Sequence, residues 1–137
     1  MIIVSACLAG LHCRYDGGEQ SNEEVIRLVV ERKAIPVCPE QLGGLSTPRL
    51  PCEIINRRVV RQDSVDVTAE FECGARDALS LVRLANAREA ILKARSPSCG
   101  AGLIYDGTFS HTVTRGDGIF AALCRAEGIS LKTEEDL

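Results

Sequence analysis

The chain has 137 residues and a mass of 14.8 kDa, close to the commonest domain size, so we expect residues 1–137 to form a single domain. Sixteen lysines and arginines against nineteen aspartates and glutamates give a net charge of −3, which disfavours binding to long nucleic acid. No apolar run approaches the ~18 residues that span a bilayer, and residues 1–9 lack the basic start of a signal peptide. Seven cysteines in such a chain indicate a cytoplasmic protein whose thiols serve metal binding or catalysis rather than disulfides.

The hydrophobic pattern alternates between short apolar runs and longer amphipathic segments. The apolar runs predict strands over residues 1–5, 34–38, 90–93, 103–105 and 129–132. The amphipathic segments predict helices over residues 22–33, 69–86 and 117–127. The connections predict a long loop over residues 39–52, a small edge hairpin over 53–61 and a loop over 94–102. We therefore expect an α/β, Rossmann-like three-layer fold with a small, mostly parallel sheet.

Local signals mark the expected ends of these elements. Ser21 with Glu24 matches a capping box at the start of the first helix, and Thr68 is placed to cap the second. Gly128 is expected to end the third helix. Pro36 weakens the second strand, because proline cannot donate to a sheet ladder.

Three cysteines follow predicted strands. Cys7 comes after the first strand, Cys38 ends the second, and Cys99 lies in the loop after the third. Because the carboxyl ends of parallel strands lie at one edge of a sheet, we expect these thiols to converge there. Their spacings of 31 and 61 residues match no zinc-ribbon or ferredoxin motif. Thiolates suit zinc or an iron–sulfur cluster, so the sequence predicts a site of that kind.

The other four cysteines are interpreted differently. Cys124 lies among apolar residues of the last helix, Cys73 lies off the apolar stripe of its helix, and Cys52 follows a proline. We interpret these three as structural residues. Cys13 lies in the loop after the first strand and is either a fourth ligand or a bystander.

Sequence blocks spread over nearly the whole chain resemble those of a known family. The blocks are Ser5–Leu8, Cys13–Gly17, Cys38–Glu40, Gly43–Leu45, Pro48–Arg49, Asp66–Thr68 with Phe71, Ala90–Lys93, Ser96–Gly100 and Ile104–Phe109. Together they resemble the small bacterial thiouracil desulfurases, long catalogued as a domain of unknown function. The resemblance implies a [4Fe–4S] cluster held by Cys7, Cys38 and Cys99 alone, with a fourth iron open to hydrosulfide. Family members often carry an aliphatic residue at Cys13, which favours the bystander role.

The resemblance also implies an enzyme that removes sulfur from a thiolated nucleobase or nucleoside without redox change and releases hydrosulfide. The open iron would act as a Lewis acid for the leaving sulfur. Glu40 is expected to be the acid/base, and Ser96 to hold the substrate or relay a proton. Arg14 and Asp16 are candidates to bind the amide edges of the base, and Arg49 is a weaker candidate for such a contact. Asp16 with Gly17 is also a standard turn pair, so a role in the turn is the alternative for Asp16.

Two other classes of function stay open. A metal- or cluster-binding sulfur-transfer protein would use the same cysteines but release no hydrosulfide from thiouracil. A cysteine-based redox- or metal-sensing module would have exposed thiols of low pKa and no pocket beside them. With two tyrosines, three phenylalanines and no tryptophan, the chain offers little stacking surface to single-stranded nucleic acid, so the expected partner is a free base or nucleoside. The sequence leaves the oligomeric state open.

Overall fold

A four-stranded parallel sheet forms the centre of the computed structural model, which describes residues 1–137. The strand order is β2 (Ala34–Val37), β1 (Ile2–Ser5), β5 (Glu89–Leu92) and β8 (Ser130–Thr133). Each neighbouring pair of strands is parallel. The strand β2 lies at the edge of the sheet, where a proline without a donor is tolerated.

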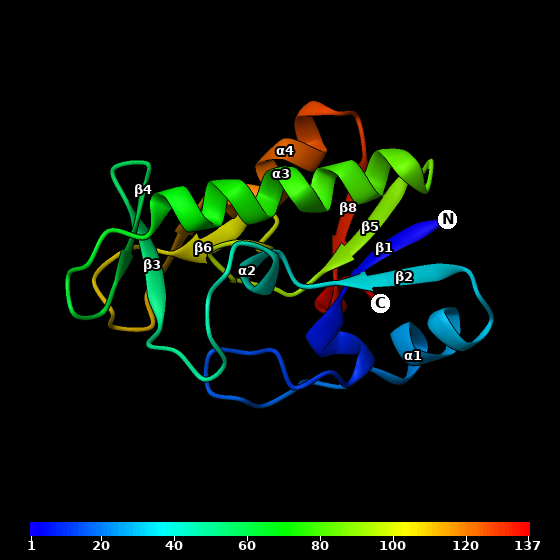
Figure 1. Ribbon diagram of the computed structural model, residues 1–137, viewed down its shortest axis with the longest axis horizontal. Helices are drawn as coiled ribbons and strands as arrows, with labels where there is room; N and C mark the ends of the chain where they lie inside the picture. The colour runs from blue at the N-terminus through cyan, green and yellow to red at the C-terminus, as the bar shows by residue number, and fades with distance from the viewer.

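Helices cover both faces of this sheet (Figure 1). The helices α3 (Thr68–Leu84) and α4 (Ile119–Ala126) lie on one face, and α1 (Glu23–Val30) lies on the other. Neighbouring residues of a strand point to opposite faces, so Ile3 packs with α3 and α4, whereas Val4 packs with Val25 of α1. The predicted three-layer α/β fold is therefore confirmed. None of the helices combines the length and the apolar character that a transmembrane span requires.

Two antiparallel hairpins lie beyond the carboxyl edge of the sheet. The predicted edge hairpin is β3 (Cys52–Ile55) with β4 (Arg58–Arg61), and both residues of its turn, Asn56 and Arg57, have positive φ. The predicted strand at 103–105 is β6 (Leu103–Tyr105), but it pairs with β7 (Val113–Arg115) and not with the parallel sheet. The sequence did not predict β7, because its three residues are exposed and carry no apolar pattern.

The start of α1 differs from the predicted capping box. Asn22 is the N-cap, and its side-chain oxygen accepts from the backbone N–H groups of Glu24 and Val25 at 3.0 and 3.2 Å. The Ser21 hydroxyl instead bonds to the carboxylate of Glu19. The helix ends at Val30, before the predicted residue 33.

The start of α3 also differs. Thr68 is the first helical residue rather than a cap, and its buried hydroxyl accepts from the backbone N–H of Val59 at 2.8 Å. The carboxylate of Asp66 accepts from the Thr68 N–H at 2.9 Å and satisfies one of the unpaired donors of the helix start.

The predicted loop at 39–52 begins with a one-turn helix, α2 (Pro39–Leu42), whose backbone touches that of α3. A Cβ atom on Gly74 would stand 1.8 Å from the carbonyl oxygen of Pro39, and one on Gly43 would stand 2.1 Å from that of Glu70. Only residues without a Cβ fit here. Because α2 carries Glu40 and follows Cys38 directly, this contact sets the position of both residues.

Gly74→Ala should therefore destabilise the protein, because the added methyl group forces α2 away from α3. We expect a net loss of about 1–3 kcal/mol in the free energy of unfolding. This loss remains although alanine favours a helix over glycine by roughly 1 kcal/mol. Urea unfolding measures this change. Ser80→Ala, at an exposed position of α3, is the control and should unfold close to the unmodified protein. An unchanged midpoint for Gly74→Ala would contradict the close backbone contact.

Candidate active site

The strands β1, β2 and β5 lead at their carboxyl ends into one cavity of about 280 Å³. The chain places β2 on one side of β1 and β5 on the other, so the strand order reverses beside β1. Ligands of open α/β sheets bind at such a switch point. Cys7 lies in the 3-10 turn Ala6–Ala9 after β1, Cys38 follows β2, and Cys99 follows β5; all three line the cavity. The structure therefore brings these three cysteines together.

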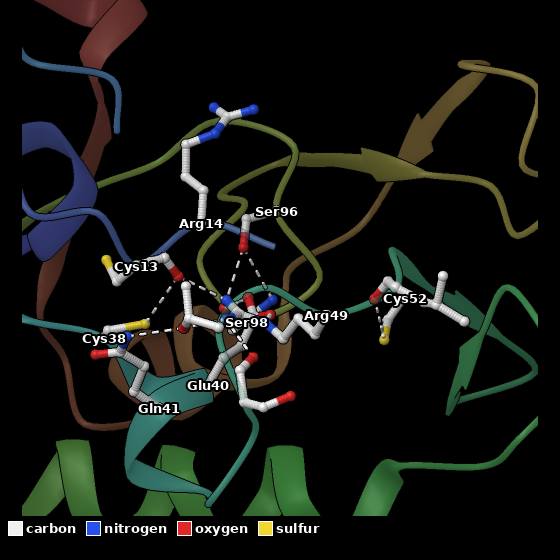
Figure 2. Close-up of polar contacts among 12 residues, drawn as sticks. Cys13, Arg14, Cys38, Glu40, Gln41, Arg49, Cys52, Ser96 and Ser98 are labelled. Carbon is white, nitrogen blue, oxygen red and sulfur yellow. Dashed lines mark hydrogen bonds and ion pairs between the residues drawn. The ribbon is translucent and has the colours of Figure 1, made fainter. Parts of the chain in front are cut away.

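A fourth thiol lies against two of them. Cys13 lines the same cavity, is buried, and forms side-chain contacts with Cys38 and Cys7. The contact with Cys38 lowers the pKa of Cys13, but the contact with Cys7 and burial outweigh it and raise that pKa to about 11. The Cys38 thiol also lies 3.9 Å from the backbone oxygen of Cys13 (Figure 2), and contact with Cys13, followed by burial, raises the pKa of Cys38.

Cys99 is a further buried thiol of the cavity. Burial raises the pKa of Cys99 to about 12, while hydrogen bonds from Ser5 and Ser98 act in the opposite direction. The Ser98 Oγ atom lies 3.6 Å from the Cys99 Sγ atom. Hydrogen bonds of this kind stabilise a thiolate, the form in which cysteine binds a metal, and a metal that binds here must displace the thiol protons.

The three cysteines that the sequence analysis interpreted as structural lie in three different surroundings. Cys124 is fully buried in the core between α3, α4 and the sheet, as expected, and Cys73 is exposed on α3. Cys52 also lines the cavity, and its thiol donates to the Leu50 carbonyl at 3.7 Å.

A carboxylate held by an ion pair forms part of the cavity wall. Arg49 Nε donates to Glu40 Oε1 at 3.1 Å, and the two side chains are only 7% and 14% exposed. Arg49 also donates to the carbonyl oxygen of Cys13 at 2.7 Å (Figure 2) and to that of Ser46 at 3.1 Å. Arg49, considered above for a substrate contact, thus uses its guanidinium group to hold Glu40 and the Cys13 loop in place.

Two serines lie between Glu40 and Cys99. Ser98 Oγ donates to Glu40 Oε2 at 2.8 Å and lies 3.0 Å from Ser96 Oγ. Ser96 Oγ accepts from the backbone N–H groups of Ser98 and Cys99 at 3.2 and 3.0 Å. The hydroxyl that contacts Glu40 is therefore that of Ser98, which the sequence analysis did not select. No sequence signal distinguishes two serines that are two residues apart in one loop.

The start of α4 fixes the loop that carries these serines. The N–H groups of Ile119 and Phe120 donate to the carbonyl oxygens of Pro97 and Ser98, both at 2.9 Å. These are the donors that a helix start leaves unpaired. Gly118 permits the approach, since a Cβ atom there would stand 2.5 Å from the carbonyl carbon of Ser98.

Aromatic and cationic side chains line other parts of the cavity. The Arg14 guanidinium lies 5.8 Å from the centre of the Tyr15 ring, and Arg14 also bonds to Gln20. Tyr105 and His111 meet edge to face with their ring centres 5.9 Å apart. Such groups can pack against a planar ring and bind its polar edge.

Asp16 does not line the cavity, although the sequence suggested a substrate contact for it. Its carboxylate accepts from the backbone N–H of Gly18 at 2.9 Å and lies 3.5 Å from Arg14 Nε. The bond from Gly18 is the main reason why the pKa of Asp16 lies below its usual value. This geometry assigns Asp16 to the turn that presents Arg14.

Two other acidic residues support the walls of the cavity, and the sequence analysis did not find them. Glu53 on β3 accepts from the N–H groups of Gly107 and Phe109 at 3.0 and 3.1 Å and so holds the loop between β6 and β7. Glu134, after β8, pairs with the cavity residue Lys93 at 3.2 Å. Both carboxylates hold, through these contacts, loops that carry cavity residues.

The donor types suit an iron–sulfur cluster. Cys7, Cys38 and Cys99 reach one cavity from three strand ends. Cysteine thiolates are the ligands that hold such clusters, and each cysteine binds its own iron. The residues present therefore fit an iron–sulfur cluster.

The same geometry argues against a thiol sensor. A redox-sensing cysteine is exposed and has a lowered pKa. Here Cys13 and Cys99 are buried with raised pKa values, and a cavity adjoins them. The fold and the cavity instead define a class of small α/β proteins that can hold a thiolate-bound cofactor at the switch point of a parallel sheet.

Comparison with known proteins identifies the family. The 2-thiouracil desulfurase family model matches residues 2–136, and the chain belongs to this family. The protein described as "Uncharacterized protein YbbK" from Bacillus subtilis (strain 168) is 43% identical over 147 aligned positions, which cover 100% of this chain and 97% of that protein. This chain also matches the solved structure of "[4Fe-4S]-dependent thiouracil desulfidase TudS (DUF523Vcz)" with a TM-score of 0.94 and 45% sequence identity. The match covers 99% of this chain and 91% of that one.

The ion pair of Arg49 with Glu40 should stabilise the site measurably. Arg49→Gln leaves a largely buried carboxylate without its partner, so we expect a loss of about 2–3 kcal/mol in the free energy of unfolding. In the double variant Arg49→Gln/Glu40→Gln the loss should be smaller than the sum of the two single losses, because no unpaired charge stays buried.

Urea unfolding of the four proteins completes this cycle. Arg83→Gln is the matched control, because it breaks an arginine–glutamate pair of 2.6 Å that lies on the surface. Its unfolding midpoint should barely move. Strictly additive losses at Arg49 and Glu40 would rule out the coupling.

Proposed function

We propose that the protein is a [4Fe–4S]-dependent desulfurase that hydrolyses the carbon–sulfur bond of thiouracil or of a related thiolated nucleobase or nucleoside. Membership of the 2-thiouracil desulfurase family supports this activity, as does 45% identity to TudS over 99% of the chain. The observation that carries the proposal is the position of Glu40 in the wall of the cavity on which Cys7, Cys38 and Cys99 converge.

Cys7, Cys38 and Cys99 are the proposed cluster ligands. They belong to three different strand ends of one sheet, so the folded sheet holds them around the cavity before any metal arrives. When bound through three cysteines, a [4Fe–4S] cluster supplies one open iron as a Lewis acid for the departing sulfur. Cys13 is the bystander of this proposal, because the family resemblance implies a cluster held by three cysteines alone.

Glu40 is the proposed acid/base. Hydrolysis of a carbon–sulfur double bond requires a proton to leave the attacking water and a proton to reach the departing sulfur. Glu40 lies at the cavity, and Arg49 holds one of its oxygens while the other faces Ser98. Ser96 contributes by fixing the loop that bears Ser98 and Cys99.

The substrate proposed for the cavity is a single planar base or nucleoside. Arg14 supplies donors for a carbonyl edge, and Tyr15, Tyr105 and His111 supply ring surfaces. The net charge of −3 disfavours a long nucleic acid as partner. The products are the oxygenated base and hydrosulfide, and we place the reaction in the cytoplasm, where cysteines stay reduced.

The ligand assignment predicts a clear division among single cysteine variants. After anaerobic reconstitution, the unmodified protein should hold about four iron and four acid-labile sulfide per chain. Cys7→Ala, Cys38→Ala and Cys99→Ala should each lose most of both. Cys13→Ala should keep them, as should the control Cys73→Ala at an exposed site. Iron loss in Cys13→Ala would make Cys13 a fourth ligand.

The activity is tested by hydrosulfide release from 2-thiouracil by the reconstituted protein. We expect release with a full cluster, and a fall of about 10²–10⁴-fold in kcat for Glu40→Gln at unchanged iron content. A full cluster without release would support a sulfur-transfer protein or a different reaction. Zinc in place of iron would contradict the proposed cofactor.

A further inference from the structure

Cys13 is a buried thiol that the proposed function leaves without a role. It is 4% exposed, lines the cavity, and contacts the side chains of both Cys7 and Cys38. It therefore lies beside two of the three proposed cluster ligands while binding no iron itself in the proposed site. Groups in this position commonly tune a metal centre through its ligands.

The backbone holds Cys13 in this position. Arg49 donates to the Cys13 carbonyl oxygen at 2.7 Å, and the Cys13 N–H donates to the carbonyl oxygen of Leu11 at 2.9 Å. Arg49 is itself fixed by its ion pair with Glu40. Because both backbone polar groups of Cys13 are bonded, the fold sets the place of its thiol beside the two ligands.

A count of protons gives Cys13 the role of donor. A cysteine binds iron as a thiolate, so Cys7 and Cys38 keep lone pairs but no proton once they are ligands. A cysteine outside the ligand set keeps its proton near neutral pH. The S–H group of Cys13 then supplies the one proton that these three sulfurs share.

Cys7 is the acceptor that the contacts favour. The contact with Cys7 raises the pKa of Cys13, as expected for a contact in which Cys13 donates, whereas the contact with Cys38 lowers it. The Cys38 thiol instead lies 3.9 Å from the backbone oxygen of Cys13 (Figure 2). The proton of Cys13 therefore points to the sulfur of Cys7.

The surroundings make this hydrogen bond effective. An S–H group is a weak donor, but Cys7 and Cys13 are only 7% and 4% exposed and pack in one apolar cluster with Val4 and Leu8. Hydrogen bonds are electrostatically stronger in such a region than in water. Hydrogen bonds to the sulfurs are among the factors that set the reduction potential of an iron–sulfur cluster.

We propose that Cys13 is a positioning residue of the cluster site, whose thiol donates an S–H···S hydrogen bond to the Cys7 ligand and so draws negative charge away from the iron. This proposal rests on the proposed [4Fe–4S] cofactor. Lower electron density raises the reduction potential of such a cluster and makes its open iron a stronger Lewis acid for a departing sulfur.

The test compares Cys13→Ala with Cys13→Ser, two variants of nearly equal size that differ in the donor. Both are reconstituted anaerobically beside the unmodified protein and assayed for iron and acid-labile sulfide, which should be equal in all three. Reductive titration followed by electron paramagnetic resonance then measures the midpoint potential. That potential should shift to lower values in Cys13→Ala, because the reduced cluster carries one more negative charge and has lost its donor. Cys13→Ser should return to the unmodified value or exceed it, because a hydroxyl is a stronger donor than a thiol.

Cys52→Ala is the matched control. Cys52 also lines the cavity, but its thiol donates to the carbonyl oxygen of Leu50 at 3.7 Å rather than to a ligand. Its removal should leave the midpoint potential unchanged. Hydrosulfide release from 2-thiouracil gives a second readout, in which kcat should fall about 10-fold in Cys13→Ala and recover in Cys13→Ser.

The outcomes separate the role of Cys13 from the proposed function. If the unmodified protein takes up no cluster, the proposed cofactor fails and the role of Cys13 fails with it. A full cluster without hydrosulfide release would overturn the desulfurase function, while the potentials still decide the role of Cys13.

Three results at full cluster content in the unmodified protein would overturn the role of Cys13 alone. The first is one midpoint potential shared by the unmodified protein and both variants. The second is an equal shift in Cys13→Ala and Cys13→Ser, which would assign the thiol to packing. The third is iron loss in Cys13→Ala, which would make Cys13 a ligand.

Discussion

Parallel strands must all end at the same edge of their sheet, and this constraint assembles the cavity from distant parts of the chain. The four strands of the central sheet run in one direction, so the segments that follow β1, β2, β5 and β8 meet at its carboxyl edge. Cys7, Cys38, Cys99 and Glu134 come from these four segments. The layers of helices bury both faces of the sheet, and the cavity lies at that edge.

Most segments at this edge have little regular structure, so polar contacts keep them in place. Arg49 joins the Cys13 loop to Glu40, Ser96 accepts from two backbone N–H groups of its own loop, and Glu53 holds the loop between β6 and β7. Several of these groups are largely buried, which makes each bond stronger and each missing partner more harmful than on the surface. The order of the site therefore depends in part on a few buried polar groups, in addition to the packing of Cys7, Cys13 and Cys99 in the apolar core.

The sequence predicted the features that depend on repeating patterns. Apolar runs located the four strands of the sheet, helical spacing located the three long helices, and the strand ends indicated where Cys7, Cys38 and Cys99 would meet. Features set by single contacts were missed. Asn22 rather than Ser21 caps α1, since neighbouring polar residues compete for the same N–H groups.

The missed site contacts have the same origin. That Ser98 rather than Ser96 faces Glu40 depends on how one turn is oriented. The ion pair of Arg49 depends on the fold of residues 41–48, which connect it to Glu40. Neither has a periodic signal. The carboxylate of Asp16 is of a type that can bind a polar ligand. It instead accepts a hydrogen bond within its own turn, as aspartate before glycine often does.

The backbone contact between α2 and α3 has a consequence for how this family can vary. Side chains that pack against each other can change rotamer when a neighbour changes, but two backbones in contact at Gly43 and Gly74 have no rotamer to change. The hydrophobic face of α3 can therefore exchange one apolar residue for another while the distance between α3 and the acid-bearing turn stays constant. In this protein the two glycines thus allow apolar substitutions on α3 without moving the turn that bears Glu40.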